Sequence, residues 1–178
     1  MDYAQLLAIA LNDIRQADFT ALRAAYTRTA HYNPYRSGAT DAGLIELMRA
    51  ENWSAAAARC ERLIAEDYLH APLHLTMSYI YQQLEDEERA AWHLAFARGL
   101  IGSLLSSGDG RSPETAFKVI TVREEYEMLR ALSLESLGQR LIAENDRYYD
   151  VLTVRDANGA EGEIFFEVTD IIRYTQGN

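Results

Sequence analysis

The chain has little cysteine and no long apolar run, and both shortages limit what it can be. Cys60 is the only cysteine among 178 residues, so no disulfide can form within the chain. The cysteine content therefore does not distinguish an oxidising from a reducing compartment. No apolar run approaches the roughly 18 residues of a membrane-spanning helix, so we expect no transmembrane segment. The first residues have neither the basic nor the apolar part of a signal peptide. The compartment is therefore left open: cytoplasmic as the sequence stands, periplasmic or exported if a signal peptide has been removed.

Positive charge is also scarce. Lysine and arginine total 17 against 27 acidic residues, which gives a net charge of −10. Residues 1–104 carry 9 basic and 13 acidic residues, and residues 105–178 carry 8 and 14, so neither part has the basic stripe that phosphate groups require. We therefore expect no nucleic acid or anionic membrane as partner. A protein or peptide partner fits this charge, and a basic one would dock fastest.

Motifs of catalysis or metal binding are missing as well. His70 and His74 have the spacing of a metal pair on a helix, but Pro72 lies between them and no third ligand is evident. Cys60 occupies a packing position, where cysteine behaves as a small apolar residue. The loop around Asp109 lacks the alternating acidic ladder of an EF-hand. We therefore expect no enzymatic activity, no cofactor and no metal site.

The strongest pattern that is present is a repeat of 34 residues, the length of a tetratricopeptide helix–turn–helix unit. Without gaps, Tyr3–Arg36, Ser37–His70 and Ala71–Leu104 align as three units. The second helix of such a unit carries a small residue and, four positions later, a large apolar one, which lets neighbouring helices approach closely. The corresponding pairs are Leu22/Tyr26, Ala56/Cys60 and Ala90/Leu94. The repeat predicts tetratricopeptide-like helical hairpins over residues 1–104, and an unrelated helical bundle is the alternative.

Each predicted hairpin turns at a polar residue that can cap a helix. These residues are Asp18, Asn52 and Asp86, whose side chains accept backbone N–H groups at a helix start. We therefore expect residues 1–104 to be wholly helical, with no strand between Tyr3 and Leu100.

Beyond Leu104 the pattern changes. Residues 105–116 form a linking loop by composition, Phe117–Thr121 is predicted to be a strand, and Val122–Leu132 a helix. Further strands are predicted over 139–144, 148–154 and 164–168, with turns at Asn145-Asp146 and Asn158-Gly159. The predicted fold class is α+β: an N-terminal tetratricopeptide-like helical hairpin stack followed by a small C-terminal antiparallel sheet with one helix. Because residues 117–178 offer only one apolar sheet face, we expect this unit to pack on the helical stack.

Several segments carry a family resemblance. They are Tyr32-Asn33-Pro34-Tyr35, the loop from Ser107 to Phe117 that begins Ser-Gly-Asp-Gly, the run Glu124-Glu125-Tyr126, and Tyr148-Tyr149-Asp150-Val151-Leu152. Over nearly its whole length the chain resembles the bacterial family called domain of unknown function 4919. The resemblance implies helices followed by an α+β part, and it implies no activity, cofactor or catalytic residue. Many members look like exported proteins with a signal peptide, whereas we expect none in the sequence as it stands, so the resemblance leaves the compartment open.

Aromatic residues supply a candidate binding surface. Tyrosine, of which the chain has 11, combines a broad contact area with a polar tip. The same residues would equally fill the packing between helices. The candidate partner-binding residues are Tyr32, Tyr35, His74, Tyr81, Asp109 and Arg111. We expect a non-enzymatic protein-protein interaction or scaffold module. The alternatives are an acidic immunity-type protein that neutralises a partner toxin, and an enzyme whose residues converge only in three dimensions.

Overall fold

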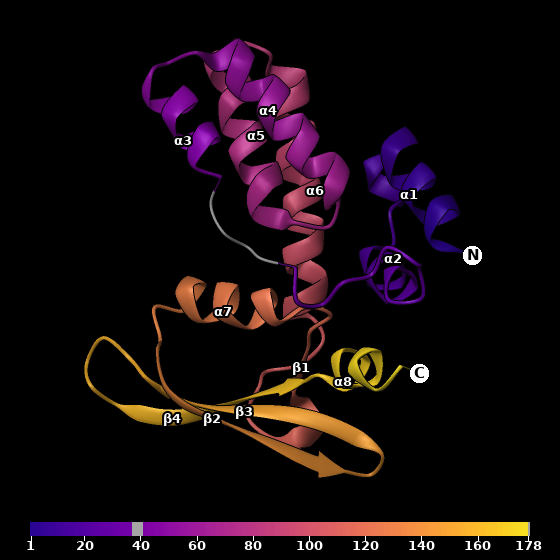
Figure 1. Cartoon of the computed structure of the whole chain (residues 1–178), viewed down its shortest axis with the longest axis vertical. Helices are drawn as coiled ribbons and strands as arrows, with labels where there is room; N and C mark the ends of the chain where they lie inside the picture. The colour runs from indigo at the N-terminus through magenta and orange to yellow at the C-terminus, as the bar shows by residue number, and fades with distance from the viewer. Residues whose placement is uncertain (37–40, 178) are drawn as a thin grey trace. The chain divides into compact units, whose positions relative to one another are not determined.

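The computed structural model of the chain describes residues 1–36 and 41–177, which divide into two compact units (Figure 1). The first unit comprises residues 1–25 and 41–103, and the second comprises residues 26–36 and 104–177. The helices come first and the sheet lies at the C-terminal end, which confirms the predicted α+β class. In the described ranges, no helix is both long and apolar enough to cross a membrane.

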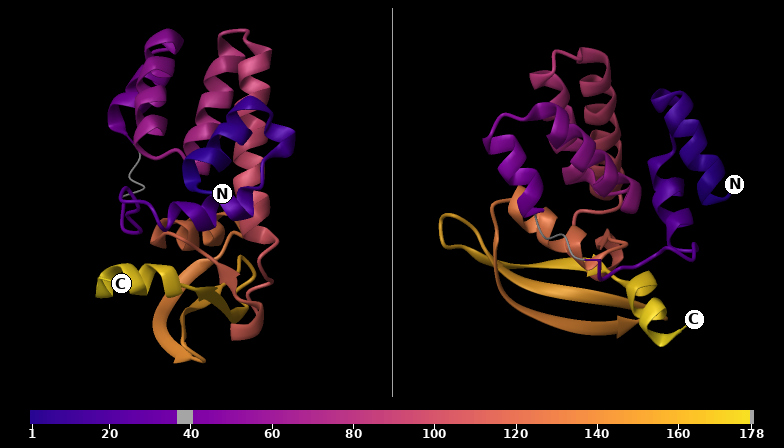
Figure 2. Two further views of the ribbon diagram at one scale, coloured as in Figure 1. Left: turned by 90° about the vertical axis from the view of Figure 1, so that its right-hand side faces the viewer. Right: turned by 45° about the horizontal axis from the view of Figure 1, so that its top comes forward.

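The first unit is built of helices. They are α1 (Tyr3–Asn12), a 3₁₀ turn (Ile14–Gln16), α2 (Phe19–Tyr26), α3 (Ala42–Arg49), α4 (Trp53–Glu66), α5 (Ala71–Gln83) and α6 (Glu87–Leu105). Helix α4 packs against both α3 and α5, and Figure 2 shows the three side by side. No strand occurs among the described residues up to Leu104, as predicted.

Two hairpin turns of this unit share one geometry at a spacing of 34 residues. Glu51 after α3 and Glu85 after α5 both take the left-handed backbone conformation, with φ of 54° and 58°. Asn52 and Asp86 then cap the following helices, each accepting a backbone N–H, at 3.4 and 3.0 Å. Asp18 caps α2 in the same way at 2.8 Å, although a 3₁₀ turn precedes it. The three predicted caps are confirmed, and the tetratricopeptide likeness stays a prediction.

Small residues allow the helices from α3 to α6 to pack closely around a common core. Ala56 is fully buried and Ala90 is nearly so, at the positions where the repeat requires close helix contact. Cys60 is also fully buried, and its thiol donates to the carbonyl of Leu73 at 3.5 Å. Burial raises the pKa of the Cys60 thiol to about 12, which disfavours the thiolate. The packing role predicted for Cys60 is confirmed.

The second unit holds a four-stranded sheet in the order β1-β4-β3-β2. Its strands are β1 (Phe117–Lys118), β2 (Glu135–Glu144), β3 (Arg147–Arg155) and β4 (Glu161–Glu167). Strands β2, β3 and β4 are antiparallel and turn at the predicted positions, where Asn145, Asp146 and Gly159 have positive φ. Strand β1 pairs in parallel with β4, so the sheet is mixed and the prediction of an antiparallel sheet is wrong at this edge. Two paired residues are too few to show a period in the sequence.

Two helices accompany the sheet instead of the predicted one. Helix α7 (Val122–Ala131) lies over one face of the sheet, and α8 (Thr169–Gln176) follows β4 (Figure 1). The face beneath α7 forms one apolar core of buried side chains: Leu104, Phe117, Val119, Met128, Leu129, Leu152, Val154, Phe166, Val168 and Ile171. Helix α8 was not predicted because Val168, the residue before its first turn, has no side chain that can cap a helix.

Residues 26–36 belong to the second unit, whereas the repeat alignment placed them in the first. The hydroxyl of Tyr32 donates to the carbonyl of Ile120 at 2.7 Å. The N–H of Val122 donates to the carbonyl of Pro34 at 3.1 Å. The Tyr32 ring also meets Tyr174 of α8 edge-on, with centroids 5.4 Å apart. These contacts fix the segment against the start of α7.

Candidate functional site

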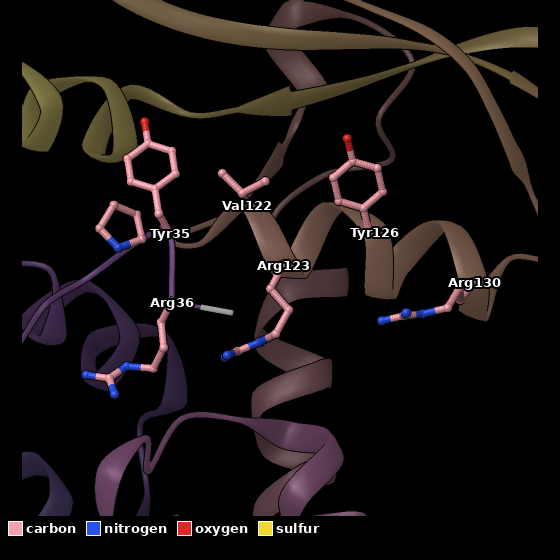
Figure 3. A pocket seen from close by; sticks show the side chains of 7 residues that line it. Tyr35, Arg36, Val122, Arg123, Tyr126 and Arg130 are labelled. Atoms are coloured by element: carbon pink, nitrogen blue, oxygen red, sulfur yellow. The ribbon is translucent and has the colours of Figure 1, made fainter. Parts of the chain in front are cut away.

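A pocket of about 320 Å³ lies in the second unit, between residues 34–36 and α7 (Figure 3). Its walls are Pro34, Tyr35, Arg36, Val122, Arg123, Tyr126 and Arg130. Three of these seven side chains are arginines and two are tyrosines. This is a concentration of positive charge on a chain whose net charge is −10. The pocket is therefore the candidate functional site.

Local hydrogen bonds fix the two walls of this pocket. On one side, Asn33 Oδ1 accepts the N–H of Tyr35 at 3.0 Å and holds the turn after Pro34. On the other side, Thr121 caps α7, so that the helix begins at Val122. Arg123, Tyr126 and Arg130 lie about one and two turns apart on α7, and Val122 lies one turn before Tyr126, so these residues follow the side of the helix that borders the pocket. The Val122–Pro34 hydrogen bond joins the walls at their base.

The three arginines differ in their partners. Arg123 is buried, and its Nε lies 3.2 Å from Glu127 Oε1 on the next turn of α7. Arg36 Nε is shielded from solvent and has no hydrogen-bond partner among the described residues. Arg130 is exposed, and within residues 1–36 and 41–177 neither it nor Arg36 takes part in an ion pair. The pocket thus carries positive charge that its own walls do not neutralise.

The two tyrosines lie on the other side of the pocket from the guanidinium groups (Figure 3). Tyr35 is 53% exposed and Tyr126 is 41% exposed. The Tyr35 hydroxyl shares a hydrogen bond of 2.9 Å with Thr175 Oγ1 of α8. The Tyr126 hydroxyl donates to Gln139 Oε1 of β2 at 3.4 Å. Both rings are held at their tips while their sides stay accessible.

Of the six candidates predicted from sequence, only Tyr35 lines this pocket. Tyr32 is adjacent but buried, and its ring is held by Tyr26 and Tyr174, so it positions the wall rather than offering a binding surface. Asp109 and Arg111 form an exposed ion pair at 3.8 Å within their own loop.

His74 and Tyr81 lie together in the interior of the first unit, which corrects their prediction as surface contacts. Fully buried His74 has Nδ1 3.0 Å from Nδ1 of His93, and its Nε2 donates to the carbonyl of Tyr68 at 3.0 Å. Since a carbonyl only accepts, Nδ1 of a neutral His74 accepts the proton of His93. Burial lowers the pKa of His74 to about 4, so the ring is neutral at neutral pH. The Tyr81 ring stacks on His93, and its hydroxyl donates to Glu61 at 2.9 Å.

This cluster adjoins a second cavity, of about 350 Å³, lined by Leu11, Glu61, Ile64, Ala65, Tyr68, Met77, Trp92 and His93. Apolar side chains predominate in its walls. In the described part of the chain, no group of three or more potential ligands could hold a metal ion.

Sequence reasoning missed six of the seven residues of the arginine–tyrosine pocket, including all three arginines and Tyr126. Arg123, Tyr126 and Arg130 share a helix face, and that spacing was visible in the sequence. Arg36 could not be connected with them, because it lies far away along the chain, and the Val122–Pro34 hydrogen bond that joins its segment to α7 has no signal in the sequence.

A buried acid lies on the sheet-facing side of α7. Glu125 is fully buried beside Met128 and Leu129, and neither of its carboxyl oxygens has a hydrogen-bond partner among the described residues. Burial, reinforced by the negative charges of Asp150 and Glu124, raises the pKa of Glu125 to about 8. Asp150 itself accepts from Gln139 Nε2 at 2.7 Å, and burial raises its pKa as well.

Comparison with known proteins places the chain in one family. The family model described as domain of unknown function (DUF4919) matches residues 3–176, so the chain belongs to that family, as the segment resemblances predicted. No curated protein and no solved structure matches the chain.

Proposed function

We propose that this member of the family of domain of unknown function 4919 is a protein-binding module, acting by contact rather than catalysis, and that its partner docks at the arginine–tyrosine pocket. One observation carries the proposal: two half-exposed tyrosines flank a pocket with three arginines. Tyrosine and arginine dominate binding hot spots because each buries a large surface and adds directional hydrogen bonds.

Rigidity of the pocket also supports docking. Both tyrosine tips are hydrogen-bonded, and the two walls are tied through Val122 and Pro34. A surface that is already ordered loses little side-chain entropy on binding, so more of the contact energy appears as affinity. The pocket volume is at the small end of the range for ligand sites, which suits one or two inserted side chains.

Site-specific crosslinking in cells that naturally express the chain tests the proposal. A photoreactive phenylalanine derivative replaces Tyr126 in one variant and Tyr79 in a matched control. Tyr79 is similarly exposed, at 46%, but lies on α5 of the first unit. We expect a crosslinked partner from position 126 and none from position 79.

Reconstitution then decides whether the captured protein is a true partner. The purified partner should bind the full chain, and Tyr126→Ala should weaken binding by about 1–2 kcal/mol or more, as truncation of a hot-spot residue does. Tyr79→Ala should leave the affinity unchanged. Equal capture at both positions, or a partner indifferent to Tyr126→Ala, contradicts the proposal.

The immunity-type alternative is favoured by a different observation, the net charge of −10, which suits a basic toxin. It predicts a single captured partner whose own activity is lost on binding. A partner that keeps its activity in the complex excludes this alternative.

A further inference from the structure

The charge of the arginine–tyrosine pocket defines the chemistry of its occupant, given the proposed function on which this step rests. We infer that the pocket receives an acidic segment of the partner, extended and carrying two carboxylates about three residues apart.

Unmatched guanidinium groups are the first reason. Glu127 neutralises part of the charge of Arg123, while Arg36 and Arg130 have no carboxylate partner in the described ranges. A guanidinium shielded from water binds carboxylates strongly, because two N–H groups can reach the two oxygens together. Arg36 Nε in particular is a shielded donor that finds no acceptor within residues 1–36 and 41–177, a state that costs free energy until an acceptor arrives. An incoming carboxylate supplies that acceptor.

The spacing of the arginines is the second reason. Arg36 and Arg130, which have no carboxylate partner in the described ranges, lie on opposite sides of Arg123 (Figure 3). Arg123 and Arg130 are seven residues apart on α7, so even their Cα atoms are separated by about 10 Å along the helix axis. One compact anion, such as a single phosphate group, cannot span that distance. A peptide in the extended polyproline II conformation has three residues per turn and rises about 3.1 Å per residue, so carboxylates three residues apart lie on one side of it and about 9 Å apart, which matches this distance. The pocket therefore fits separate charges on one chain better than one concentrated charge.

The tyrosines account for what lies between those charges. The rings of Tyr35 and Tyr126 point to the side away from the guanidinium groups, with Val122 between them (Figure 3). An apolar residue between the two acids can contact these rings while its neighbours meet the arginines.

A peptide titration of the full chain tests this inference. The probe is acetyl-Ala-Glu-Phe-Ala-Glu-Ala-amide, and its matched control has glutamine in place of both glutamates. Binding is followed by the amide NMR shifts of the isotope-labelled protein. We expect the largest shifts at Tyr35, Arg36 and α7, with the glutamine peptide binding at least about tenfold more weakly, since a hydrogen bond to a charged carboxylate is stronger than one to a neutral amide.

Two variants with the same loss of charge localise the binding. Arg130→Gln should weaken binding of the glutamate peptide about tenfold or more. Arg111→Gln, at a side chain that is 85% exposed and does not line the pocket, should change it by less than about twofold. Both positions are exposed, so neither substitution is expected to unfold the chain.

Several outcomes would overturn the inference: equal binding of both peptides, no binding at millimolar concentration, or equal effects of the two variants. Inorganic phosphate that saturates the pocket as readily as the peptide would refute the spacing argument. If crosslinking at position 126 identifies a partner but the acidic peptide does not bind, the proposed function stands and this inference fails. If the peptide binds as expected but no partner is captured, the anion site stands and the proposed function fails.

Discussion

Replacing Glu125 by methionine should stabilise the second unit at neutral pH, because the wild-type side chain keeps a proton there that the unfolded chain does not. The carboxyl is fully buried without a hydrogen-bond partner in the described residues, and Asp150 on β3 and Glu124 on α7 add negative charge nearby. Its pKa rises from 4.5 to about 8 on folding. Methionine has a similar length, does not ionise, and adapts to an irregular core.

The direction of the pH effect follows from the raised pKa. Below pH 4.5 both folded and unfolded states hold the proton, and Glu125 imposes no ionisation cost. As pH rises toward 8, the unfolded state loses its proton while the folded state retains it, so stability falls by about 1.4 kcal/mol per pH unit. The cost should be about 1 kcal/mol at pH 5 and about 3 kcal/mol at pH 7. Glu125→Met removes it.

Hydrogen exchange of the β3 amides measures this effect, because both tryptophans, Trp53 and Trp92, lie in the first unit and report on it alone. The free energy of opening should fall between pH 5 and pH 7 by about 2 kcal/mol more in the wild type than in Glu125→Met. Glu125→Gln should also lose this pH dependence, although it keeps a buried polar group and gains less stability. As control, Glu144→Gln at an exposed position of β2 should behave as the wild type. Identical pH profiles for wild type and Glu125→Met would refute the reasoning.

Four further predictions concern stability. Tyr32→Phe should cost about 1–3 kcal/mol in the second unit, since it leaves the buried Ile120 carbonyl without its donor; unchanged exchange in β3 would contradict this. Ala90→Leu should overpack the first unit and cost about 1–3 kcal/mol by tryptophan-monitored urea unfolding, and a wild-type midpoint would show that the position is not a close contact. The lowered pKa of His74 predicts that the first unit loses stability as pH falls from 6.5 toward 4, because the imidazole is protonated in the unfolded state but stays neutral in the folded state. A urea midpoint that does not change over this pH range would argue against this prediction. A fragment of residues 110–178 should be unfolded by circular dichroism, because it lacks residues 26–36 and part of the core, and a cooperative melt of that fragment would contradict this.

The elements that the sequence predicted well are those governed by local chemistry. Asp18, Asn52 and Asp86 cap helices because a short polar side chain next to a helix start can reach its free N–H groups wherever the rest of the chain lies. The turn at Asn145-Asp146 is equally local, since few residues other than glycine tolerate positive φ at low cost.

Contacts between distant segments escaped prediction, and the candidate site depends on them. The parallel pairing of β1 rests on two residues, and the docking of residues 26–36 rests on Tyr32 and Pro34. The local sequence does not distinguish a tyrosine that is buried and hydrogen-bonded, such as Tyr32, from an exposed one, such as Tyr35. The wall formed by residues 34–36 could therefore not be assigned to the pocket before the fold was known.

The assignment of residues 26–36 to the second unit has a consequence for synthesis of the chain on the ribosome. Tyr32 is translated early, but its partners Ile120 and Tyr174 are translated only after all of α3 to α6. At about 5–20 residues per second, the segment waits on the order of ten to thirty seconds for Tyr174. During that interval the helices of the first unit can fold, while the Tyr32 ring and the Pro34 turn still lack the surface that will cover them. We therefore expect a nascent chain stalled before Ile120, which has neither of these two partners, to expose an aromatic segment near its N-terminus to chaperones.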